Sequence, residues 1–176
     1  MVTRSSNTLA AVAASLMLCT PAIAQEAASK LPGGASSLQE TYQDWSLSCQ
    51  GTPKTVCGIS QQQMQQNGQR VLAIELRRSA DGGLSGNLVL PFGLSLDAGA
   101  ALQVDAAAPQ KPVRFSTCLP AGCLVPLTFD AEEAAVLKNG TALKVNVQSS
   151  DAKQVTLSIS LKGLAAAIAR LEALGT

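Results

Sequence analysis

Short segments in which apolar and polar residues alternate constrain the fold of this chain more than any other feature. In segment 70–78, Leu72, Ile74 and Leu76 share one side of an extended chain, and the same period of two recurs in 143–147 and 155–161. A period of two with one apolar face is typical of half-buried strands in an antiparallel sheet. Further strands are expected at 43–49, 84–91, 101–105, 112–118 and 122–129. Strands at this spacing predict an all-β antiparallel sandwich.

One hairpin and two helices complete the predicted elements. Asn67-Gly68 predicts a hairpin that joins segment 55–65 to segment 69–78. The glutamine cluster at 61–66 indicates polar surface or an edge strand, which could serve as an interaction edge. A short internal helix is expected at 131–138, after the capping residue Asp130. A C-terminal helix is expected at 163–174, either docked on the sandwich or free to bind a partner. Docking is favoured over a membrane surface because its polar face has little positive charge.

The first 24 residues have the organisation of an export signal. A run of about ten apolar residues ends at Leu18, and Ala22-Ile23-Ala24 matches an A-x-A cleavage site. We expect a signal peptide at 1–24, cleavage after Ala24, and a periplasmic or cell-envelope location; the alternative is an uncleaved anchor. Residues 25–41 are rich in Ala, Ser and Gly and predict a flexible linker. A single sandwich domain is expected over 42–176.

The charge of the chain excludes some classes of partner. Without residues 1–24, which contain only Arg4 among the charged residues, 12 basic and 12 acidic residues remain. Nucleic-acid binding requires a basic surface, and attachment to anionic lipid requires basic clusters. We therefore expect no nucleic-acid partner and no strong membrane binding of the mature domain.

Four cysteines follow the signal: Cys49, Cys57, Cys118 and Cys123. An even number in an exported chain indicates two disulfides, for which three connectivities exist. The local pairs Cys49–Cys57 and Cys118–Cys123 are favoured because turn-forming residues separate the members of each pair. A redox-active dithiol is the alternative, although neither pair is C-x-x-C. A zinc site made of all four lacks the usual short spacing.

The chain contains no histidine. This excludes a Ser-His-Asp triad, a Cys-His pair and histidine metal ligands, and no P-loop motif is present. Glu132 and Glu133 are expected to stabilise the N-terminus of their helix, because negative charge there interacts favourably with the helix dipole. Asp97 and Asp105 could bind a cation but are more typical of solvated turns. Trp45, the one tryptophan, is expected to anchor the core. We assign no catalytic residue, metal site or cofactor.

The order of several motifs resembles the invasion-associated locus B family of exported bacterial proteins. These motifs are Asp44-Trp45-Ser46-Leu47-Ser48-Cys49 with Cys57, the segment 90–99 that contains Pro91, Phe92, Gly93 and Gly99, Val104-Asp105, the segment 115–123 that contains Cys118 and Cys123, and Leu161-Lys162-Gly163-Leu164. The resemblance covers roughly residues 42–174, and it departs at Leu164, where the family tends to have an aromatic residue. It implies an immunoglobulin-like sandwich, an envelope location and no established enzymatic activity. It also implies structural roles for the cysteines, Trp45, Pro91, Gly93, Gly99 and Gly163.

These features favour a non-enzymatic envelope protein that binds a protein partner through a sheet edge or the C-terminal helix. A link to host-cell invasion is implied only for pathogenic relatives. The alternative function is a thiol-dependent redox protein that uses Cys118 and Cys123. A third hypothesis is binding of small apolar ligands between the sheets.

Overall fold

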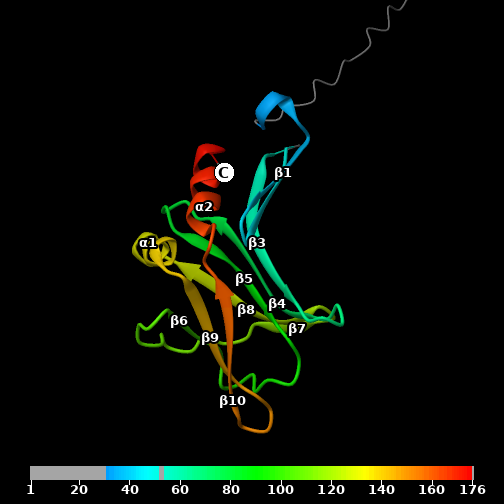
Figure 1. Cartoon of the computed structure of the whole chain (residues 1–176), viewed down its shortest axis with the longest axis vertical. Coiled ribbons are helices and arrows are strands. Elements are labelled where there is room, and N and C mark those ends of the chain that lie inside the picture. Colours follow the sequence, from blue (N-terminus) through cyan, green and yellow to red (C-terminus); the bar gives the residue numbers. More distant parts are fainter. Residues whose placement is uncertain (1–30, 52–53, 176) are drawn as a thin grey trace, which may run out of the picture.

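Two antiparallel sheets form a sandwich in the computed structural model, which describes residues 31–51 and 54–175 (Figure 1). The strands are β1 (Ser37–Tyr42), β2 (Trp45–Gln50), β3 (Val56–Met64), β4 (Arg70–Arg78), β5 (Leu84–Leu90), β6 (Ala101–Val104), β7 (Thr117–Leu119), β8 (Gly122–Phe129), β9 (Ala142–Gln148) and β10 (Gln154–Ser160). The larger sheet has seven strands in the order β1-β2-β3-β4-β5-β8-β7, and the smaller has three in the order β10-β9-β6. A 3-10 turn, η1 (Pro32–Gly34), and two helices, α1 (Ala131–Asn139) and α2 (Leu164–Ala173), complete the fold. The expected all-β, immunoglobulin-like sandwich with a short internal helix and a C-terminal helix is confirmed.

The core lies between the sheets and beneath α2. On β4 the alternation seen in the sequence becomes burial, since Leu72, Ile74 and Leu76 are each 1% exposed. Burying a side chain of this kind stabilises the folded state by about 1.5–3 kcal/mol relative to leaving the side chain exposed to water. α2 packs against β1, β2, β3 and β4, at the opposite end of the molecule from the β9–β10 turn (Figure 1). Docking of the C-terminal helix, the favoured prediction, is therefore confirmed.

Side chains from the larger sheet hold the edge of β10. The indole Nε1 of Trp45 and the Nε2 of Gln61 both donate to the Ser160 carbonyl, each at 2.9 Å. The Oε1 of Gln61 accepts from the Ser160 amide at 3.2 Å, and Gln63 donates to the Ser158 carbonyl. The prediction that the glutamine cluster forms polar surface is therefore wrong for Gln61, which is 6% exposed, whereas Gln63 is half-buried. The alternative of an edge strand is wrong, because β3 lies between β2 and β4. In β3 both glutamines lie on the inward-facing side, where they pair with backbone groups of the second sheet.

Both helices begin as their sequences indicate. Asp130 caps α1, because its carboxylate accepts from the Glu133 amide at 2.8 Å while Glu133 accepts from the Asp130 amide at 3.1 Å. Gly163 precedes α2 with a φ of 87°. A Cβ at this glycine would collide with the Tyr42 carbonyl, so the start of α2 passes directly over the β1–β2 turn.

Two boundaries differ from the predictions. The flexible linker expected over 25–41 is wrong for its last residues, because β1 begins at Ser37 and Leu31 is only 3% exposed. β1 is a polar edge strand that pairs with β2 through its backbone, so its side chains carried little apolar signal. The strand expected at 112–118 is largely wrong. Only Thr117–Leu119 joins the sheet, and Val113 makes a single bridge to Ala100. The signal segment 1–24 lies outside the described residues.

The loop between β5 and β6 contains Pro91, Gly93 and Gly99, which are expected from the sequence to have structural roles. Pro91 follows the last residue of β5 directly, where its missing N–H cannot extend the ladder. Gly93 has a φ of 86°, and Gly99 has a φ of 70°. A Cβ at Gly99 would lie 2.7 Å from the Val113 carbonyl oxygen, which explains why only glycine fits this close approach.

Candidate interaction surface

Both disulfides join directly opposed residues of neighbouring strands. Cys49–Cys57 links β2 to β3, and Cys118–Cys123 links β7 to β8. The structure therefore has the two local pairs favoured by the sequence, and neither disulfide bridges the two sheets. Cys49 and Cys57 are 1% and 4% exposed, and Cys123 is 3% exposed, whereas Cys118 lies at the exposed end of the sheet.

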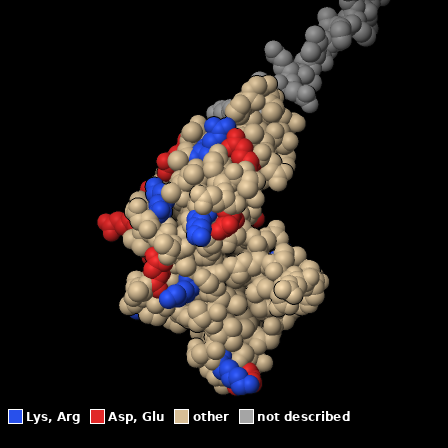
Figure 2. Space-filling view, in the orientation of Figure 1, with Lys and Arg blue, Asp and Glu red and all other residues tan. Residues whose placement is uncertain are grey.

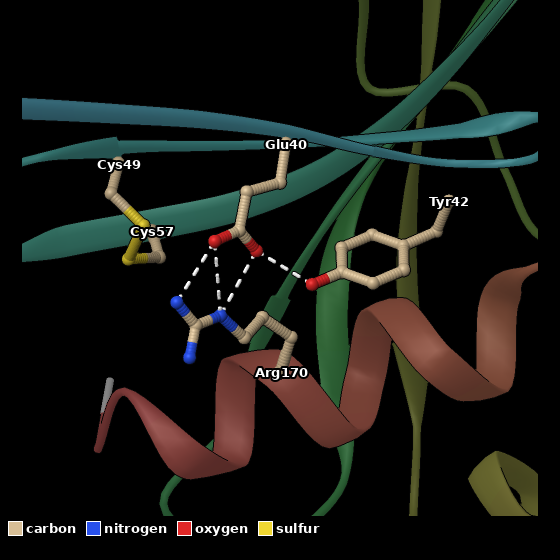
Figure 3. The surroundings of a disulfide bond; sticks show 5 residues. All are labelled: Glu40, Tyr42, Cys49, Cys57 and Arg170. Atoms are coloured by element: carbon tan, nitrogen blue, oxygen red, sulfur yellow. Dashed lines mark hydrogen bonds and ion pairs between the residues drawn. A yellow bond between two sulfur atoms is a disulfide. The ribbon is translucent and has the colours of Figure 1, made fainter. Parts of the chain in front are cut away.

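A charged cluster beside the first disulfide holds α2 on β1 (Figure 3). The Nη2 of Arg170 donates to Glu40 Oε1 at 2.8 Å and its Nε donates to Oε2 at 2.9 Å. The Tyr42 hydroxyl donates to the same carboxylate at 2.6 Å. The Arg170 guanidinium, followed by the Tyr42 hydroxyl, lowers the pKa of Glu40. The hydrogen bond to Glu40 raises the pKa of Tyr42. The Arg170 guanidinium and the Glu40 carboxylate fasten the helix to β1, so this cluster is a structural contact.

The other carboxylates singled out in the sequence also serve the fold. Asp105 accepts from the amides of Thr141 and Ala142 and from the Thr141 hydroxyl, and these bonds, with that hydroxyl first, lower its pKa. Glu133 completes the α1 cap, and Asp97 is exposed. Among residues 31–51 and 54–175, no group of three or more His, Cys, Asp or Glu side chains is placed to hold a metal ion. No helix in the described part of the chain has the length and apolar character needed to cross a membrane.

One end of the larger sheet exposes apolar side chains beside Arg70, the first residue of β4. Met64, Phe92 and Leu119 are 57%, 62% and 49% exposed. Met64 lies at the β3–β4 turn, Phe92 follows β5, and Leu119 lies at the β7–β8 turn. The strand register puts these three places at the same end of the sheet, and the Arg70 Nη2 donates to the Ala121 carbonyl across it at 2.7 Å. We call the surface formed by Met64, Phe92 and Leu119 the uncharged end, because β3, β5, β7 and β8 contain no charged residue; Arg70 of β4 lies beside this surface.

The space-filling view shows the extent of this surface. The lobe at the lower right, where Figure 1 places β7 and the β3–β4 turn, is tan, whereas the charged side chains in view lie mainly along the left and top (Figure 2). The sequence contains the corresponding signal. Segments 56–69, 82–96 and 115–129 contain no charged residue, and they supply β3, β5, β7 and β8. The sequence alone does not reveal this surface, because only the sheet topology brings the three segments together.

Comparisons with known proteins agree with this architecture. Residues 45–172 match the family model described as Invasion associated locus B (IalB) protein. The chain belongs to this family. An Invasion protein B homolog of Brucella abortus (strain 2308) is 49% identical over 150 residues, which cover 84% of this chain and 86% of the relative. Invasion protein B of Bartonella bacilliformis is 33% identical over 159 residues, covering 88% of this chain and 85% of that protein.

A solved structure extends the family relationship to the fold. The crystal structure of invasion associated protein b from Bartonella henselae aligns with a TM-score of 0.74 and 36% identity, covering 78% of this chain and 97% of that chain. The resemblance deduced from the cysteine, Trp45 and glycine motifs is thus confirmed at the level of the family. The family takes its name from invasion and is not named for an enzymatic activity.

Proposed function

We propose that this family member is an exported, non-enzymatic envelope protein that binds a protein partner through the uncharged end. The observation that carries the proposal is the exposure of Met64, Phe92 and Leu119 at one end of the larger sheet, where β3, β5, β7 and β8 carry no charge and Arg70 of β4 lies beside them. Contiguous exposed apolar side chains mark interaction surfaces, and depletion of charge is typical of the centre of a protein interface. The expected partner presents an apolar, uncharged surface.

Two other parts of the molecule are less suited to this role. The apolar face of α2 is occupied by the sheet, since Leu164, Ile168 and Leu171 are at most 3% exposed. The edge of β10 is bonded at Ser158 and Ser160 by Gln61 and Gln63. The names of the relatives connect those proteins with invasion, and binding of another protein through the uncharged end would be one physical basis for such a role.

A photo-crosslinking amino acid placed at Phe92 in living cells tests this proposal. We expect a specific protein adduct from position 92 and none from Val56, an exposed apolar residue at the other end of β3 that serves as the matched control. Phe92→Ser should reduce capture from a cross-linker at position 64 by about tenfold, because aromatic residues are common interface anchors. Identical adducts from positions 92 and 56, or full capture by the Phe92→Ser variant, would contradict the proposal.

The second candidate function is thiol-disulfide exchange at Cys118–Cys123. The exposure of Cys118 favours it, because an attacking thiolate needs access to a sulfur atom. No histidine is present to activate either thiol, and no charged residue occurs in 115–129. The reduction experiment described in the Discussion separates this candidate from the structural interpretation.

A further inference from the structure

A small apolar pocket lies between α1, β6 and the loop that follows β6. Its volume is about 120 Å³. Leu102, Phe129, Leu137 and Leu143 line it and are each 2–3% exposed. Because these side chains belong to the packed core, the floor of the pocket is rigid and is formed before any ligand arrives.

The rim of the pocket is fastened by a hydrogen bond between the loop and the helix. Gln110 Nε2 donates to Glu133 Oε1 at 3.0 Å, and the backbone amide of Gln110 donates to the Leu102 carbonyl at 2.7 Å. The other oxygen of Glu133 accepts from the Asp130 amide. The loop is therefore held against β6 and α1 on both sides of the opening.

Val136 makes the rim apolar as well. It lines the pocket, yet it is 54% exposed, so an apolar group entering the pocket would also cover part of this valine. Glu132 and Glu133 lie one turn before it on α1, and Asp130 precedes them. The entrance thus combines an apolar rim with negative charge.

The volume of the pocket selects the size of its occupant. An engineered apolar cavity of about 150 Å³ accepts benzene, so this pocket fits a slightly smaller group such as a branched aliphatic side chain. Pockets for complete small-molecule ligands are larger, about 300–1,000 Å³. A single apolar side chain presented by a polypeptide is therefore a better match than a free ligand within the sandwich.

We propose that the pocket between α1 and β6 binds one leucine-sized side chain of a protein segment that carries basic residues beside it. The acidic first turn of α1 supplies the charge complementarity. This inference rests on the proposed function only in that the ligand is a protein. α1 and β7 lie on opposite sides of the molecule in Figure 1, so this pocket and the uncharged end form separate surfaces.

Short blocked peptides test this inference on the purified protein by NMR titration. Acetyl-Lys-Leu-Lys-amide is expected to shift the amide signals of Leu102, Val136 and Leu137, while the same peptide with serine in place of leucine shifts none. The peptide with glutamates in place of both lysines should bind several-fold more weakly. Val136→Ser should weaken binding of the leucine peptide about fivefold, because part of the apolar contact is lost. Val56→Ser, at an exposed valine distant from the pocket, should leave binding unchanged.

A pocket-filling variant makes the test independent of the rim. Val104→Phe places a larger side chain at the pocket wall and is expected to abolish the shifts while circular dichroism remains that of a folded sandwich. The inference is overturned if the leucine peptide shifts no pocket signal, or if Val136→Ser binds it as tightly as the parent protein. Cross-linking from position 92 should be unaffected by these variants, so failure here is distinguishable from failure of the proposed function.

Discussion

Trp45 connects the two sheets through one fully buried ring and one hydrogen bond. The ring is 0% exposed, and its Nε1 donates to the Ser160 carbonyl of β10. Ser160 also accepts from Gln61, so loss of the indole would not leave this carbonyl without a partner. The contribution of Trp45 therefore comes mainly from filled volume and from one net hydrogen bond.

We predict that Trp45→Phe lowers the free energy of unfolding by about 2 kcal/mol, from the smaller ring and the lost bond. Urea denaturation followed by circular dichroism measures this, because the variant contains no tryptophan. Phe92→Leu, at an exposed aromatic residue, is the control and should change stability by less than about 0.5 kcal/mol. Equal stability of the two variants would show that Trp45 does not anchor the core.

The attachment of α2 to β1 depends on an ion pair that responds to pH. Glu40 has a lowered pKa because Arg170 and Tyr42 donate to its charged form. A carboxylate with a lowered folded-state pKa stabilises the protein above its unfolded value, and this stabilisation is lost as the pH falls through the folded value. The contribution of Glu40 should therefore be complete above its ordinary pKa of 4.5 and decline below it.

Replacing Glu40 by glutamine tests this dependence. We predict that Glu40→Gln lowers the urea midpoint at pH 7 and that the difference from the parent protein shrinks as the pH falls from about 4.5 towards 2. Glu75→Gln is the matched control, since the Glu75–Arg77 pair also joins a carboxylate to an arginine but its side chains are 56% and 57% exposed. Exposed pairs contribute little to stability. A difference for Glu40→Gln that grew on acidification would contradict the assignment.

The two disulfides differ in how deeply their strands bury them. Both sulfurs of Cys49–Cys57 belong to the core, whereas Cys118 is exposed at the β7–β8 hairpin. The chain-entropy model gives about 2–3 kcal/mol for closing loops as short as these, separations of 8 and 5 residues. Burial adds more packing to the first disulfide, because both of its cysteines are buried, whereas in the second only Cys123 is.

We predict that dithiothreitol reduces Cys118–Cys123 first and that the Cys49→Ser/Cys57→Ser variant loses more stability than Cys118→Ser/Cys123→Ser. Mass mapping of alkylated cysteines during a reductant titration establishes the order, and urea denaturation establishes the stabilities. Reduction of Cys118–Cys123 by mild reductant at the potential of a catalytic dithiol would support the redox function. Reduction of both pairs only under denaturing conditions would support the structural one.

Features determined by neighbouring residues were predictable from this sequence. The alternation in 70–78 marks β4 because strand periodicity is local, and Asp130 and Glu133 mark the start of α1 because a capping box spans only four residues. The pairing of Cys49 with Cys57 was favoured because both lie beside one turn.

Features that depend on distant partners were missed. β1 has few apolar residues and exists because its backbone pairs with β2. Segment 112–118 looks extended in the sequence, but only Thr117 and Cys118 join the larger sheet, and Val113 makes a single bridge to Ala100. The inward direction of Gln61 required knowledge of β10, 99 residues away along the chain. The uncharged end was likewise hidden, because its three apolar residues come from three separate turns or loops.

The bonds that Gln61 and Gln63 make to β10 also affect how copies of this protein behave toward one another. An edge strand with open carbonyls is a template on which a foreign strand can add, and that is the first step of fibre growth. At Ser158 and Ser160 the glutamine amides already occupy those carbonyls. The amides take the place of a further strand, since no strand among the described residues pairs with this edge of β10. The smaller sheet is thereby capped at these two residues, and we expect the bonds to hinder the addition of a strand from another molecule there.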